Sequence, residues 1–239
     1  MKKIILLVML SAALLAPQAV LGAKTAAIDP VKLQDLGVKM IDKRVTAIQK
    51  YDDLLSKTKY VSQPILDQIR GELNRVKGEL EALKTKIQGE TDIATLKADV
   101  KSIGTNYRVY QVLLPQSSGF VAVDRIKAYE AQLNELKSKT SSKADELEKA
   151  GKDVSAIRSL ITTAEGNLSA GSSNIAAAES KFAAMTISDP EGARTLKLDG
   201  KTALVNAKQN FSEARKNLRD AVQEIKKLAK PANTSTQTE

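Results

Sequence analysis

The sequence predicts an all-α fold, an elongated antiparallel bundle of about six long, coiled-coil-like helices. Three observations lead to this prediction. Apolar residues recur at alternating spacings of three and four over most of the chain, which is the period of an amphipathic helix. Aromatic residues make up only 3% of the chain, as expected for long helices rather than a sheet. The breaks between periodic segments carry the Pro, Gly, Asp and Ser residues that start and end helices.

The N-terminus has the pattern of a secretory signal peptide. Lys2 and Lys3 precede an apolar stretch at 4–15, and small residues follow at 22–23. An uncleaved membrane anchor is the alternative, but the apolar stretch is shorter than the ~20 residues that a membrane span needs. We therefore predict a signal peptide at 1–23 and export to the periplasm, the cell envelope or the exterior. No later stretch is long and apolar enough to predict an integral membrane segment.

The first half of the mature chain is expected to hold three helices, at 30–57, 62–89 and 93–114. Asp29 followed by Pro30 is a helix-start signal, because the carboxylate caps a free N–H and the proline pre-sets φ. Within the third helix, the β-branched and aromatic residues of YRVYQVLL also suit a short strand. We favour a helix because the spacing of apolar residues continues through it.

The stretch PQSSG at 115–119 is predicted to be the main internal break. Beyond it we expect helices at 120–150, 153–186 and 189–230. Alanine occupies many apolar positions of the last two, which predicts an antiparallel helical hairpin. The predicted domains are an N-terminal three-helix segment (24–115), a C-terminal three-helix segment (116–230) and a disordered tail (231–239). Two separate units and one continuous bundle both remain open.

Composition argues against catalysis and metal binding. The chain has no histidine, which removes the usual general base, and no cysteine, which removes thiolate nucleophiles and ligands. We expect no enzyme activity, no cofactor and no metal site.

The formal charge of +9 favours anionic partners only weakly. Basic and acidic residues are interspersed along every predicted helix, and 189–230 holds ten Lys or Arg against six Asp or Glu. No basic tract is interleaved with aromatic residues. We therefore expect no nucleic-acid partner, while peripheral binding to an anionic surface remains possible.

Tyr107, Arg108 and Tyr110 are the candidate interaction residues. They lie close together in a chain with five tyrosines and three phenylalanines. Tyrosine and arginine recur at binding hot spots because they combine a large contact area with directed hydrogen bonds. The alternative is that both tyrosines plug the end of a helix seam beside a domain junction.

Two segments, DIATLKADVKSIGTNYRVYQVLLPQ (92–116) and AGKDVSAI (150–157), show a resemblance to other proteins. The chain resembles a group of uncharacterised exported helical proteins of small-genome candidate-phylum bacteria, in which a similar tyrosine-arginine block precedes a proline and a long helix. The resemblance covers the chain from the first mature helix to about residue 184. It implies export and a helical fold, and it supplies no activity and no binding residues.

These observations predict a non-enzymatic exported scaffold or protein-interaction protein. It would act by presenting long amphipathic faces to another protein or to a second copy of itself. The alternative is a holdase-type envelope chaperone whose basic helical arms hold unfolded exported clients.

Overall fold

The computed structural model describes residues 29–229, and this range is helical apart from short connections. The prediction of an all-α fold is confirmed. The signal peptide predicted at 1–23 and the tail predicted at 231–239 lie outside the described residues.

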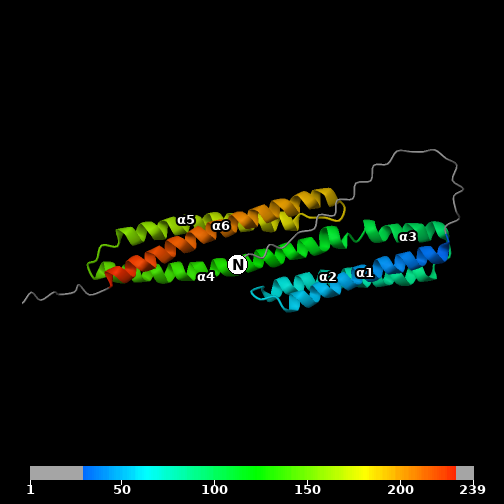
Figure 1. Ribbon diagram of the computed structural model, residues 1–239, viewed down its shortest axis with the longest axis horizontal. Coiled ribbons are helices and arrows are strands. Elements are labelled where there is room, and N and C mark those ends of the chain that lie inside the picture. Colours follow the sequence, from blue (N-terminus) through cyan, green and yellow to red (C-terminus); the bar gives the residue numbers. More distant parts are fainter. Residues whose placement is uncertain (1–28, 230–239) are drawn as a thin grey trace, which may run out of the picture.

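The helices form an elongated arrangement around one interrupted spine (Figure 1). α3, a short π-helical turn η1 and α4 follow one another along the molecule. The α1–α2 hairpin packs against one end of this spine, and the α5–α6 hairpin packs against the other. The bounds are α1 (Pro30–Ser56), α2 (Gln63–Gly89), α3 (Ile93–Thr105), η1 (Val109–Leu113), α4 (Leu114–Lys149), α5 (Ser155–Ala183) and α6 (Pro190–Leu228).

Local capping explains where several helices begin. The side chains of Asp29, Asp92 and Asp189 each accept a hydrogen bond from a backbone N–H in the first turn of α1, α3 and α6. Pro30 and Pro190 follow two of these caps, at positions where the missing N–H costs nothing. The starts of α1 and α6 are therefore fixed by adjacent residues.

The position predicted for the main break is wrong. Residues 115–119 continue within α4, and the spine is interrupted earlier, between Thr105 and Val109. There Arg108 adopts a left-handed conformation, with φ 42° and ψ 35°. The third predicted helix is consequently split, and α3 has only 13 residues. The strand considered for 107–114 is also excluded, because 109–113 form the π-helical turn.

Pro115 explains why the wider turn occurs where it does. A proline inside a regular helix lacks an N–H and clashes with the carbonyl four residues earlier, which here belongs to Gln111. Gln111 lies within η1, and the Leu114 N–H reaches back five residues to the Val109 carbonyl. This winding lets Pro115 stand in the first turn of α4 instead of ending the helix.

Two large apolar clusters fill the two ends of the molecule. One joins α1, α2 and α3, the other joins α4, α5 and α6, and η1 contributes residues to both. A smaller cluster lies between the end of α4, the start of α5 and the end of α6. Phe120 packs against both large clusters. The boundary predicted at 115 therefore falls inside a continuous helix that contributes to both.

The last two helices pack closely and run in opposite directions, as their alanine-rich seams predict (Figure 1). Gly171 of α5 faces the ring of Phe211, and Gly200 of α6 faces the ring of Phe182. Among the described helices, none has the length and apolarity that crossing a membrane would require.

Candidate interaction site at the helical junction

The candidate site surrounds the interruption between α3 and α4. The backbone of Arg108 lies in the left-handed region, which costs a non-glycine residue roughly 1–2 kcal/mol. Its side chain is held locally, because Nε donates to the Thr105 carbonyl at 3.2 Å and Nη1 donates to Gln111 Oε1 at 2.8 Å. Residues held in such strained conformations cluster at functional sites, which makes this turn the first place to look for one.

Tyr110 connects the interruption to α1. Its hydroxyl donates to the Lys43 carbonyl at 2.9 Å, and the guanidinium of Arg44 lies over its ring, 5.7 Å from the centroid. The side chain is still 50% exposed. Tyr110 therefore presents a fixed aromatic surface to the outside.

Two cavities adjoin this tyrosine. The first, of about 300 Å³, is lined by Arg44, Gly104, Arg108, Val109, Tyr110 and Gln111. The second, of about 350 Å³, is lined mainly by apolar residues of η1, α4, α5 and α6, together with two lysines: Tyr110, Leu114, Pro115, Ser118, Gly119, Ala122, Phe182, Lys197, Lys201 and Leu204. Neither lining contains a carboxylate, so both cavities favour an anionic or aromatic group.

Lys197 is a partly buried cation at the junction. Partial burial lowers the pKa of its ammonium group, and the neighbouring charges of Lys201 and Arg194 lower it further. No described carboxylate forms an ion pair with any of the three. An anion placed beside Lys197 would therefore relieve an existing repulsion.

Tyr107 faces a different neighbourhood, on the α2 side of the spine. It is partly buried, and burial together with the charge of Glu79 raises the pKa of its hydroxyl. The cavity beside it, of about 310 Å³, includes Glu72, Arg75 and Met185 in its lining.

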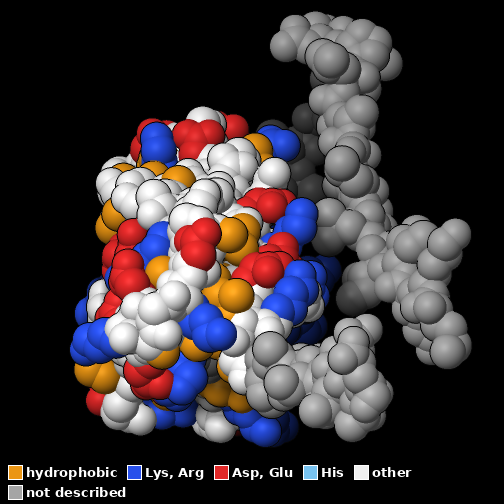
Figure 2. Space-filling view, turned by 90° about the vertical axis from the view of Figure 1, so that its left-hand side faces the viewer, with side chains coloured by type: hydrophobic (Ala, Val, Ile, Leu, Met, Phe, Trp, Pro, Cys, Tyr) orange, Lys and Arg blue, Asp and Glu red, His pale blue; other side chains and the backbone are white. Residues whose placement is uncertain are grey.

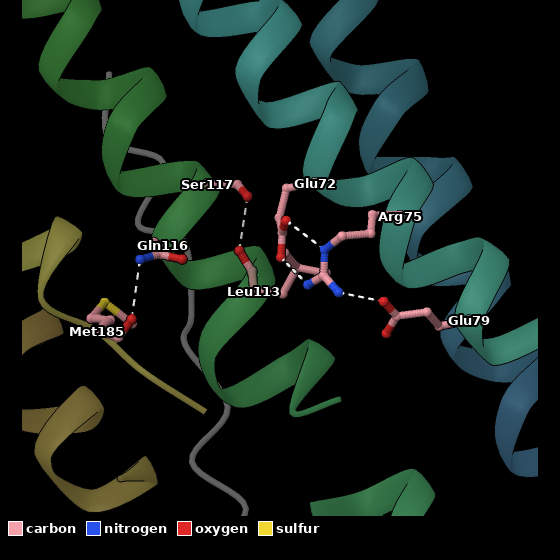
Figure 3. A network of polar contacts seen from close by, with 7 residues as sticks. All are labelled: Glu72, Arg75, Glu79, Leu113, Gln116, Ser117 and Met185. Atoms are coloured by element: carbon pink, nitrogen blue, oxygen red, sulfur yellow. Dashed lines mark hydrogen bonds and ion pairs between the residues drawn. The ribbon is translucent and has the colours of Figure 1, made fainter. Parts of the chain in front are cut away.

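A polar network borders this second neighbourhood (Figure 3). Arg75 donates to Glu72 at 2.9 and 2.5 Å and also to Glu79, all within α2. From the start of α4, the amide of Gln116 donates to the carbonyls of Phe182 at 2.9 Å and Met185 at 3.2 Å. Gln116 thereby ties the end of α5 and the connection that follows it to the start of α4.

The structure thus places the three candidate residues predicted from the sequence in two different neighbourhoods. Arg108 and Tyr110 line one cavity together, whereas Tyr107 lies beside another. Sequence reasoning missed Arg44, Lys197 and Lys201, which come from distant parts of the chain. The spacing of the two lysines, one helical turn apart, was the only local sign that they share a face.

Charge over the end formed by the α4–α5 connection and the end of α6 is mixed. Figure 2 shows basic, acidic and apolar side chains interspersed there. Within residues 29–229, no group of three or more potential acidic metal ligands comes together.

No family model, curated protein or solved structure matches this chain.

Proposed function

We propose that this protein is an exported, non-enzymatic scaffold that binds a protein partner, or a second copy of itself, at the helical junction. The observation that carries the proposal is the rigid turn at Arg108 and Tyr110. A half-exposed aromatic ring is held by a hydrogen bond and a cation, beside a strained arginine and two cavities. Fixed aromatic and arginine side chains lose little freedom on binding, which is why they recur in hot spots.

The shape of the helices supports the scaffold role. Coiled-coil-like helices packed as hairpins on a spine expose long surfaces, and α4 and α6, with 36 and 39 residues, would each extend about 55 Å or more at 1.5 Å per residue. We further propose that the helices form one elongated antiparallel bundle that acts as a single body. Phe120, which packs against both large clusters, supports this part of the proposal.

The proposals of export and of a non-enzymatic role are based on the sequence. The signal-peptide pattern at 1–23 supports export, and the lack of histidine and cysteine supports a non-enzymatic role.

The test is photo-crosslinking in the producing cell from Gln111, which is exposed beside the turn. A matched probe at Lys149, exposed at the far end of α4, serves as the control. Capture of one or two defined proteins, or of the chain itself, from position 111 and not from 149 is the expected result. It should be lost when Arg108→Ala and Tyr110→Ala are combined.

Other results would redirect the proposal. Capture of many unrelated exported proteins from both positions would favour the holdase chaperone. If nothing is captured from position 111, the junction is not a protein-binding surface and the proposal is wrong.

A further inference from the structure

The charges of α6 are sorted by face. Arg194, Lys201, Lys208 and Arg215 recur every seven residues, so they lie above one another on the helix. Three further cations, Lys197, Arg219 and Lys226, fall on the same side within about a sixth of a turn of this line. We call these seven residues the basic stripe. From first to last it extends roughly 48 Å along the helix, at 1.5 Å per residue.

The acidic residues of α6 lie elsewhere. Those within the helix are Glu191, Asp199, Glu213, Asp220 and Glu224. They fall between about a quarter and half a turn away from the centre of the basic stripe. α6 therefore has a cationic side and an acidic side, although its net charge is small.

The basic stripe is exposed and nearly unpaired. Six of its seven residues are exposed, and Lys197 is partly buried. Within residues 29–229, the only carboxylate within ion-pair distance of any of them is Asp220, at 3.9 Å from Arg219. Three arginines outside the stripe, Arg70, Arg75 and Arg158, do have closer carboxylate partners. Unpaired like charges in a row repel one another, and a negatively charged partner would relieve that repulsion.

Two exposed apolar residues decide between the possible anionic partners. Leu198 is 56% exposed and Val205 is 61% exposed. They are seven residues apart and flank Lys201 on the side away from the core. A soluble linear polyanion would leave both in water, whereas a lipid surface would take up their side chains while its headgroups meet the cations.

We propose that the basic stripe of α6 is a peripheral binding surface for an anionic phospholipid bilayer. The cations contact headgroup phosphates, and Leu198 and Val205 enter the boundary between headgroups and acyl chains. This surface shares Lys197 and Lys201 with the cavity beside Tyr110, whereas the rest of the stripe lies outside that lining. Vesicle binding and capture of a protein partner are separate measurements, so the two proposals can fail separately.

The test is vesicle sedimentation with the chain from Lys24 onward. This form holds every described helix and omits the apolar N-terminal segment, which would bind vesicles by itself. Vesicles contain equal parts of phosphatidylglycerol and phosphatidylcholine, and pure phosphatidylcholine vesicles are the neutral comparison. We expect binding to the anionic vesicles only, and loss of it in high salt.

Variants locate the surface. Combining Lys201→Gln, Lys208→Gln and Arg215→Gln should weaken binding roughly a hundredfold, since each basic side chain near an anionic surface contributes about a fivefold gain. The matched control combines Lys32→Gln, Lys97→Gln and Lys101→Gln, which removes the same charge from exposed residues of α1 and α3. Circular dichroism checks that the helices remain.

A second pair of measurements separates a lipid surface from a soluble polymer. Combining Leu198→Ser with Val205→Ser should weaken vesicle binding several-fold and leave any binding of inorganic polyphosphate unchanged. The proposal is overturned if the chain does not bind anionic vesicles, or if the control variant loses as much binding as the stripe variant. It is also overturned if the serine variant binds vesicles normally, because the stripe would then suit a linear polyanion.

Discussion

The α1–α3 end and the α4–α6 end of the molecule pack their helices with different side chains. The buried cluster of α1, α2, α3 and η1 consists of isoleucine, leucine and valine. The cluster of α4, α5 and α6 contains five buried alanines together with Phe182, Phe211 and Met185. In the first case many aliphatic side chains share the interior. In the second, small residues bring α5 and α6 close together, and two rings fill the remaining space.

This difference predicts that single substitutions affect stability unequally at the two ends. A Cβ added to Gly171 would lie 2.2 Å from the ring of Phe211, so the glycine and the ring fit each other closely. Tyr129 adds an edge contact to the same ring, with centroids 6.3 Å apart. If a ring held between facing helices is removed, small shifts of the neighbouring side chains cannot fill the space that it leaves. A single substitution at the α5–α6 end should therefore cost more than one at the other end.

The largest expected effect is that of Phe211→Ala, which should lower the free energy of unfolding by about 3–5 kcal/mol. The comparison is Leu80→Ala, at an equally buried position of α2, which should cost about 3 kcal/mol because aliphatic neighbours can partly fill the space. Urea denaturation followed by circular dichroism measures both. The predicted contrast between the two ends is wrong if Leu80→Ala lowers the free energy of unfolding as much as Phe211→Ala does.

Alanine substitutions at glycines sharpen the comparison. Gly171→Ala should destabilise the protein by roughly 1–3 kcal/mol, because the new methyl group meets the Phe211 ring. Gly37→Ala, in α1, should cost less, because its Cβ would lie 2.9 Å from a methyl group of Val100.

The control for both is Gly166→Ala, in the same helix as Gly171. A Cβ there meets nothing within 4 Å, so this change should stabilise the protein by about 0.5–1 kcal/mol through helix propensity. Thermal unfolding gives the order. A stabilising Gly171→Ala would show that the α5–α6 seam is not tightly filled.

The junction between the two ends should respond differently. Arg108→Gly should raise the free energy of unfolding by about 1 kcal/mol, because glycine adopts the left-handed conformation without strain. The same change should abolish capture of a partner from position 111. Chemical denaturation and crosslinking are measured on one preparation. A loss of stability would show that the hydrogen bonds of the arginine side chain outweigh the strain.

The smallest expected effect is that of Arg75→Gln, at no more than about 0.5 kcal/mol at neutral pH, because this pair is largely exposed. The hydrogen bond from Arg75 lowers the pKa of Glu72 below its usual value of 4.5. A lowered carboxyl pKa stabilises the fold above the unfolded value, and this contribution is lost as pH falls through the folded pKa. The difference between the variant and the unaltered protein should therefore shrink as pH falls below about 4.5 and disappear below the lowered pKa of Glu72. Lys97→Gln, at an exposed lysine of α3, is the control and should show no such change.

The charge of α6 shows how a correct count can hide a pattern. The segment from 189 to 230 has only four more basic than acidic residues, which argues against a polyanion partner when the charges are simply summed. Placed on a helix, the same residues separate into a cationic side and an acidic side. The seven-residue spacing of Arg194, Lys201, Lys208 and Arg215 was available in the sequence. It becomes informative only when the buried face of α6 is known, because the stripe then lies beside that face and not within it.

The sequence by itself determined the helical fold and most helix limits, because apolar period, capping and proline act within a few residues. Asp29 and Pro30 mark the start of α1 as predicted, and α6 begins at Pro190, next to the predicted limit of 189. The tertiary structure decided where the spine is interrupted and which neighbours Tyr107 and Tyr110 meet. Those outcomes depend on contacts such as that between Tyr110 and the Lys43 carbonyl, 67 residues apart. A local sequence pattern cannot predict such a partner, because the two residues come together only when the helices have packed.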